Sequence, residues 1–128
     1  MPKLPLGLKC IIGYHFLALL GGAVTLLYTP SNWIHLGLFL ISISIVIGII
    51  KKRSYTFVTL LVYHLFYVLQ AIVNFLSSDI PLTLNNLSSI NPLTLILLKL
   101  LIELSIVLYI IFNKSANSHL HLHQEDKN

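Results

Sequence analysis

The chain has 128 residues, of which 56% are hydrophobic and only 9% are charged. Soluble domains carry about 25% charged residues, so this composition excludes an ordinary soluble domain and is typical of a single integral membrane domain. The net charge of +4 comes from basic residues near the ends of apolar segments, so it indicates membrane topology and not a nucleic-acid partner. The single cysteine, Cys10, excludes an internal disulfide and any Cys-x-x-Cys motif.

Four long apolar runs predict the fold. They cover residues 8–28, 33–50, 55–76 and 93–112. Each has about 18 to 22 residues, and at 1.5 Å per residue each can cross a hydrocarbon core about 30 Å thick. Helices satisfy their own backbone hydrogen bonds in lipid. We therefore expect an all-α, four-helix membrane bundle over residues 1–114, whose first run is too long for a cleaved signal peptide.

Basic residues predict the direction of these spans. The two loops at 29–32 and 77–91 contain no Lys or Arg. The positive-inside rule then places both termini in the cytoplasm, as in a multi-pass protein of a bacterial cytoplasmic membrane. Asn91 is expected to cap the fourth helix, with Pro92 as its first residue. The basic residues lie on the opposite side from those two loops: Lys3, Lys9, Lys51, Lys52, Arg53 and Lys114.

The pair Tyr-His occurs in both the first and the third run, at an offset of 49 residues. Because these two spans run in the same direction, the repeat favours two duplicated helical hairpins. Helical spacing puts each histidine on a face with small and polar residues, and such faces pack inside a bundle. The repeated pairs are Tyr14-His15 and Tyr63-His64. The predicted packing faces are His15, Ala18, Gly22 and Thr25 in the first run; Gly37, Ser44 and Gly48 in the second; and His64, Tyr67, Ala71 and Asn74 in the third.

Three interpretations of the two histidines stay open. Neutral imidazoles could form hydrogen bonds across the bundle to Thr25, Asn74, a tyrosine hydroxyl or a backbone carbonyl. His15 and His64 could instead be the axial ligands of a haem, or members of a proton relay. If residues are counted from the outer ends of the spans, the two histidines lie at the same depth in the membrane. If they are counted from the flanking basic residues, the two depths differ by about 7 Å at helical rise.

Lys99 and Glu103 are the only charged side chains well inside an apolar run. Each costs about 2.5 to 3.5 kcal/mol at the centre of a span. At i and i+4 they share a helix face and can pair, although Lys before Glu is the less favourable order, which suggests that at least one has another partner. One hypothesis is an ion pair, mutual or with another helix or subunit, that fixes assembly. The other is an ion or proton site.

The last residues, 115–128, form a polar segment that we expect to be a disordered cytoplasmic tail. Alternate positions carry His119, His121 and His123, which an extended segment would present on one side as a weak site for zinc or copper. No nucleotide-binding loop, nucleophile elbow or helical His-Glu-x-x-His motif occurs, so the sequence does not favour an enzyme.

The opening PLGLKCIIGYHFLALLGGAVTLL, followed by KKRSY after the second run, resembles small bacterial four-span membrane proteins. These share a Pro-x-Gly lead and a basic-aromatic cluster after the second span, and they are largely of unassigned function. The resemblance covers about the first 60 residues and implies a fold and little chemistry.

These observations support one leading hypothesis and two alternatives. The leading hypothesis is an accessory or assembly subunit of a larger membrane complex, or a homo-oligomer, with the lipid bilayer and other subunits as its partners. The first alternative is a small proton-coupled transporter or channel that uses Glu103 and Lys99. The second is an electron-transfer protein with a haem bound by His15 and His64.

Overall fold

The computed structural model describes residues 3–29, 31–80 and 90–121. Four long helices match the predicted runs, and within these ranges no strand occurs. Each long helix is apolar and long enough to cross a membrane, which confirms the all-α, four-helix prediction. Asn91 caps the fourth long helix as expected, because its side chain accepts a hydrogen bond from the Thr94 backbone N–H at 2.9 Å. The helices are α1 (Leu6–Tyr28), α2 (Trp33–Lys51), α3 (Thr56–Leu76), α5 (Pro92–Phe112) and α6 (Lys114–His121).

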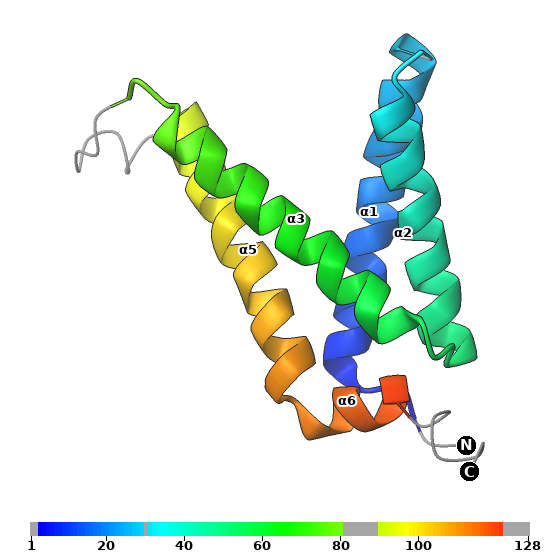
Figure 1. Cartoon of the computed structure of the whole chain (residues 1–128). Helices are drawn as coiled ribbons and strands as arrows, with labels where there is room; N and C mark the ends of the chain where they lie inside the picture. Colours follow the sequence, from blue (N-terminus) through cyan, green and yellow to red (C-terminus); the bar gives the residue numbers. More distant parts are fainter. Residues whose placement is uncertain (1–2, 30, 81–89, 122–128) are drawn as a thin grey trace.

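The long helices form two hairpins. The most extensive contacts are those of α1 with α2 and of α3 with α5, whereas α2 meets α3 over a smaller area and α1 makes little backbone contact with α3 or α5. Figure 1 shows the hairpins as the two arms of a V. We call the closed end of the V, where α1 begins and α5 ends, the α6 end, and the opposite end the open end.

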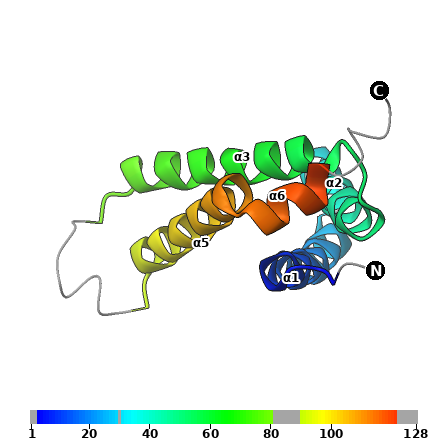
Figure 2. The same ribbon diagram turned by 90° about the horizontal axis from the view of Figure 1, so that it is seen from below.

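The buried apolar core lies at the α6 end. Side chains from all four long helices meet there, and α6 adds two more that are almost completely buried. Figure 2, which views the molecule from the α6 end, shows α6 extending from α5 toward α2. Because the hairpins diverge away from this end, little core remains between them at the open end. The core cluster comprises Leu8, Ile11, Ile45, Ile49, Leu60, Tyr63, Ile110, Ala116 and Leu120.

The short helix α6 corrects the prediction of a disordered tail for residues up to 121. Asn113 ends α5 and at once caps α6, since its side-chain oxygen accepts a hydrogen bond from the Ala116 N–H at 3.0 Å. Ala116 and Leu120, one helical turn apart, both face the core. His119 forms a hydrogen bond between Nε2 and the carbonyl oxygen of Ile49 at 3.1 Å. The segment is predicted to be disordered because its composition is polar. The core contacts of Ala116 and Leu120 explain why it nevertheless forms a helix.

The α2–α3 turn depends on a close approach between Gly48 and Thr56. Both residues are buried, and a Cβ atom on Gly48 would overlap the Thr56 side chain. The turn itself is tightened by Lys52, which ends α2 in the left-handed region with φ of 50°. Glycine at position 48 therefore lets α3 reverse direction directly against α2.

The predicted packing faces are only partly confirmed. Gly48 and Ala71 are buried, but Asn74 is exposed and open space lies beside Gly37. Asn74 and Gly37 lie toward the open end, where α2 and α3 have already separated. The predicted interior position of Asn74 is therefore wrong. Helical spacing placed Gly48 and Ala71 correctly in the interior, but it could not show where along each helix the neighbouring helix moves away.

We expect Gly48→Leu to lower the free energy of unfolding by about 1–3 kcal/mol, because the added side chain must displace Thr56 from a filled space. Gly37→Leu is the matched control, since open space lies beside the backbone at that position. Thermal unfolding of both variants in mild detergent would measure the difference. Equal stability of the two variants would contradict the close approach.

Candidate functional site

Polar side chains from all four long helices meet at one depth. Tyr14 and His64 each lie eight residues after the start of their helices, and Ser42 and Glu103 each lie nine residues before the end of theirs. At 1.5 Å per residue these positions are all about 12 to 14 Å from the α6 end, near the middle of a hydrocarbon core. The four polar groups meet because they lie at the same depth and because the hairpins approach each other there.

Glu103 is the centre of this cluster. Its carboxylate is completely buried. His64 Nδ1 lies 2.5 Å from Glu103 Oε2, and the Tyr14 hydroxyl donates a hydrogen bond to Oε1. An ionised carboxylate can only accept hydrogen bonds, so beside it Nδ1 of His64 carries the hydrogen. Groups from α1 and α3 thus satisfy both oxygens of an α5 carboxylate.

A second, uncharged set of contacts lies next to the first. His15 Nδ1 is 2.7 Å from the Ser42 hydroxyl oxygen, and the Ser42 hydroxyl donates to the Tyr63 oxygen at 3.3 Å. All three side chains are buried. Because Ser42 uses its hydrogen toward Tyr63, it accepts from His15, whose hydrogen is then on Nδ1.

The repeated Tyr-His pair has a crossed arrangement that the sequence did not predict. Each histidine contacts the partner helix of its own hairpin: His15 on α1 contacts α2, and His64 on α3 contacts α5. Each tyrosine instead reaches the opposite hairpin, Tyr14 to α5 and Tyr63 to α2. The two tyrosines therefore connect the hairpins in both directions. The gene duplication itself stays a prediction.

Both imidazoles present one unsatisfied nitrogen to the interior. Nε2 of His15 and Nε2 of His64 are buried and have no hydrogen-bond partner within the described ranges. The two rings are in contact, with centroids 5.3 Å apart. Tyr63 packs against both rings, at 5.0 and 5.3 Å. Buried polar atoms are normally paired, so two adjacent unsatisfied nitrogens mark a place where water or a proton can be received.

Lys99 does not form the mutual ion pair considered for it. Its Nζ lies 4.3 Å from the centre of the Tyr67 ring, in a cation–π contact. Among the described residues, the basic side chain in contact with the Glu103 carboxylate is His64, and this contact is an ion pair only while His64 is protonated. The expectation that at least one of the two charges has another partner is confirmed, because Glu103 finds partners on two other helices.

The positions of His15 and His64 do not fit a haem. A bis-histidine haem needs a porphyrin plane between the two imidazoles. Here the rings touch and both are fully buried, so a porphyrin could enter only if the hairpins separated. The ambiguity in their relative depth is also removed: α1 begins at Leu6, before Lys9, and the two histidines are level.

The structure also tests the hydrogen-bond partners expected for the two histidines and the metal site expected in the last residues. The histidines contact Ser42 and Glu103 instead of Thr25 or Asn74, and the Thr25 hydroxyl donates to the Gly21 carbonyl at 3.0 Å. The described residues contain no group of three or more His, Cys, Asp or Glu side chains that could hold a metal ion. His119 contacts α2, and α6 is helical where the metal prediction needs an extended segment; His123 lies outside the described residues.

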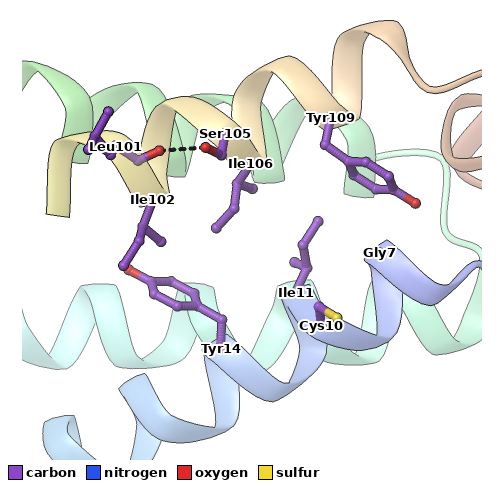
Figure 3. A pocket seen from close by; sticks show the side chains of 9 residues that line it. All are labelled: Gly7, Cys10, Ile11, Tyr14, Leu101, Ile102, Ser105, Ile106 and Tyr109. Atoms are coloured by element: carbon purple, nitrogen blue, oxygen red, sulfur yellow. Dashed lines mark hydrogen bonds between the residues drawn. The ribbon is translucent and has the colours of Figure 1, made fainter. Parts of the chain in front are cut away.

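Of the cavities in the described part of the chain, two lie on opposite sides of the polar cluster. One lies between α1 and α5 toward the α6 end, has a volume of about 410 Å³ and is mostly apolar. Figure 3 shows Tyr14 and Tyr109 at its two ends, with Ile11 of α1 pointing toward Ile106 of α5. The Tyr14 hydroxyl that contacts Glu103 therefore belongs to the wall of this cavity.

The other cavity lies between α1, α2 and α3 toward the open end and has a volume of about 150 Å³. We call it the polar cleft, because five of its nine lining residues are polar or carry a hydroxyl group, although apolar atoms form the larger part of its surface. Ala18, Gly22 and Thr25, three positions of the predicted α1 face, form one wall. The polar lining is Thr25, His35, Ser42, Tyr63 and Tyr67.

Ser42 and His35 are site residues that the sequence did not single out. The predicted face of α2 contained Ser44, which lies about 200° around the helix from Ser42. Ser44 is only half-buried, whereas Ser42 is almost completely buried. Both serines stand between isoleucines in the stretch ISISI, so their surroundings in sequence could not distinguish them.

Comparison of the chain with models of known protein families, with curated proteins and with solved structures finds no match. The function must therefore be argued from the geometry of the site.

We expect Tyr14→Phe to lower the free energy of unfolding by about 1.5–3 kcal/mol, because it removes a hydrogen bond to a buried charge. Tyr63→Phe should cost about 0.5–1.5 kcal/mol, since it removes a longer bond between two neutral hydroxyls. The two variants delete the same atom from equivalent members of the repeat. Equilibrium unfolding in mixed micelles would measure both, and a greater loss in Tyr63→Phe would contradict the central role of Glu103.

Proposed function

We propose that this chain is a small proton-coupled transporter or channel in which Glu103 is the group that gains and loses a proton. The observation that carries the proposal is the burial of Glu103 at mid-span with His64 and Tyr14 as its partners. An ionisable group at membrane depth is a functional-site hypothesis by default. Here it also lies between two cavities that approach it from opposite ends.

The contacts around Glu103 support proton transfer more than a purely structural role. A structural ion pair would be served by Lys99 one turn away on the same helix, yet Lys99 contacts Tyr67. Glu103 is instead paired with a histidine, the side chain whose charge changes most readily near neutral pH. The unsatisfied Nε2 nitrogens of His64 and of the adjacent His15 supply further proton acceptors.

The direction of the chain in the membrane belongs to the same proposal. Lys3, Lys9 and the Lys51–Arg53 cluster all lie near the α6 end, where α1 begins and α2 ends. Basic residues favour the cytoplasmic side of a bacterial membrane. We therefore place the α6 end in the cytoplasm, which makes the polar cleft open toward the outside and the apolar cavity lie on the cytoplasmic side.

An assembly role is a second proposal, as a homo-oligomer or as a subunit of a larger membrane complex. Gly13 and Gly21 of α1 are exposed, and open space lies beside both. Small residues on a lipid-facing surface let a neighbouring helix approach closely. Two hairpins that diverge also leave helix faces on which another subunit could pack. This proposal is compatible with transport, because four helices enclose little space of their own.

Proton flux tests the first proposal. Glu103→Gln keeps the shape of the side chain but cannot carry the proton, so we expect acid-driven proton uptake into liposomes to fall to the level of protein-free vesicles. A pH-sensitive dye inside the vesicles measures the uptake. The matched control is Asn74→Leu, which removes an exposed polar group of α3 and should leave the flux unchanged. Equal flux in wild type and Glu103→Gln would exclude Glu103 from the pathway.

Oligomer mass tests the second proposal. If α1 packs closely against a neighbouring subunit, Gly21→Leu should weaken that contact and shift the protein toward monomer in mild detergent. Light scattering during size-exclusion chromatography measures the mass. Leu69→Phe, at an exposed position of α3, is the control. A wild-type protein that is already monomeric in several mild detergents would contradict the homo-oligomer.

A further inference from the structure

The polar cleft differs from an ordinary gap between membrane helices. Most of the surface of these helices is apolar, yet the cleft groups hydroxyls and an imidazole from three helices around one space. His35 and Thr25 lie within a few residues of the helix ends at the open end, whereas Ser42 and Tyr63 lie at mid-span. The polar lining thus extends from the membrane surface to the polar cluster.

We propose that the polar cleft is a water-filled half-channel through which protons enter from outside; this inference rests on the proposed function. A volume of about 150 Å³ exceeds that of one water molecule, which occupies about 30 Å³ in the liquid, so a short chain of waters fits. Waters need polar partners at a site, and the lining hydroxyls provide them. The small residues Ala18 and Gly22 leave the space that larger side chains would fill.

The floor of the cleft connects it to Glu103. Ser42 and Tyr63 line the cleft and contact each other, and Ser42 is 2.7 Å from Nδ1 of His15. Hydroxyl groups both donate and accept, so transfer toward Glu103 begins when the Ser42 hydroxyl turns its hydrogen toward His15 and the His15 hydrogen is on Nε2, which leaves Nδ1 free to accept. The His15 ring touches His64, which is bonded to Glu103. The two unsatisfied Nε2 nitrogens are the atoms through which the proton leaves the His15 ring and enters the His64 ring.

Charged and titratable groups surround this route in a defined order. His35 from α2 stands at the mouth, and Tyr63 and Tyr67 from α3 form the inner wall. From α1, Tyr14 and His15 contact the His64 ring. From α5, Glu103 accepts from His64, and Lys99 stands against Tyr67 without lining the cleft. Among the described residues, those that line the cleft therefore include no lysine or arginine.

Cysteine reactivity tests whether the cleft contains water. In a Cys10→Ser background, Ala18→Cys places a thiol in the cleft, whereas Leu17→Cys places one at the same depth on an exposed apolar surface. Thiolates form only where water reaches them. A charged, membrane-impermeant methanethiosulfonate added from outside should modify Ala18→Cys about tenfold faster or more. Equal rates for the two positions would overturn the half-channel.

Filling the cleft tests whether protons use it. Gly22→Leu should reduce proton flux at least about fivefold, because a Cβ at this position already lies 3.2 Å from Phe39 and the remaining atoms must occupy the cleft. Leu69→Phe adds comparable bulk at an exposed position of α3 and should leave the flux unchanged. Thermal unfolding checks that both variants remain folded.

The two proposals fail in different ways. If Glu103→Gln abolishes flux but folded Gly22→Leu conducts normally, the half-channel is wrong and the proton-coupled function stands. If Ala18→Cys is labelled rapidly but Glu103→Gln conducts normally, the cleft contains water and the proposed function is wrong. Modification of Ala18→Cys should also block the flux that remains in that variant, and unchanged flux after complete modification would count against entry through the cleft.

Discussion

A carboxylate placed in the middle of an apolar bundle must find hydrogen-bond donors inside the protein, because lipid offers none. This requirement organises the whole structure around Glu103. One donor comes from α3 as His64 and the other from α1 as Tyr14, so a single side chain of α5 draws on both hairpins. Leaving such a charge unpaired would cost about 3–5 kcal/mol, comparable with much of the stability of a small domain.

The crossed contacts explain how a V-shaped bundle holds together. The hairpins share an apolar core only near the α6 end, and beyond it they are joined at mid-span by the polar cluster. Polar contacts of this kind are directional, whereas apolar packing in lipid gains little from hydrophobicity. The tyrosine hydroxyls that reach across the interface therefore act together with the α2–α3 turn and the core at the α6 end to orient one hairpin relative to the other.

The same arrangement gives the site its chemical character. The buried carboxylate, two touching imidazoles and several hydroxyls form a nearly continuous polar path, with the polar cleft on one side and a mostly apolar cavity on the other. Polar groups that only stabilise a fold need no connection to a cavity on either side of the bundle. On one side this path reaches the polar cleft, and on the other only the Tyr14 side chain separates Glu103 from the apolar cavity. Such an arrangement suits controlled proton transfer.

The sequence by itself determined the four helices and their bounds to within two residues, and it singled out His15, His64 and Glu103, because apolar length and the cost of buried polarity are local properties. It also contained the cap at Asn113 and the spacing of Ala116 and Leu120, although the polar composition around them suggested disorder. Only the tertiary structure decided that Ser42 and not Ser44 faces inward, that Lys99 contacts Tyr67, and that Asn74 is exposed. These outcomes depend on the angle at which the hairpins cross, and that angle follows from contacts between residues far apart in the chain.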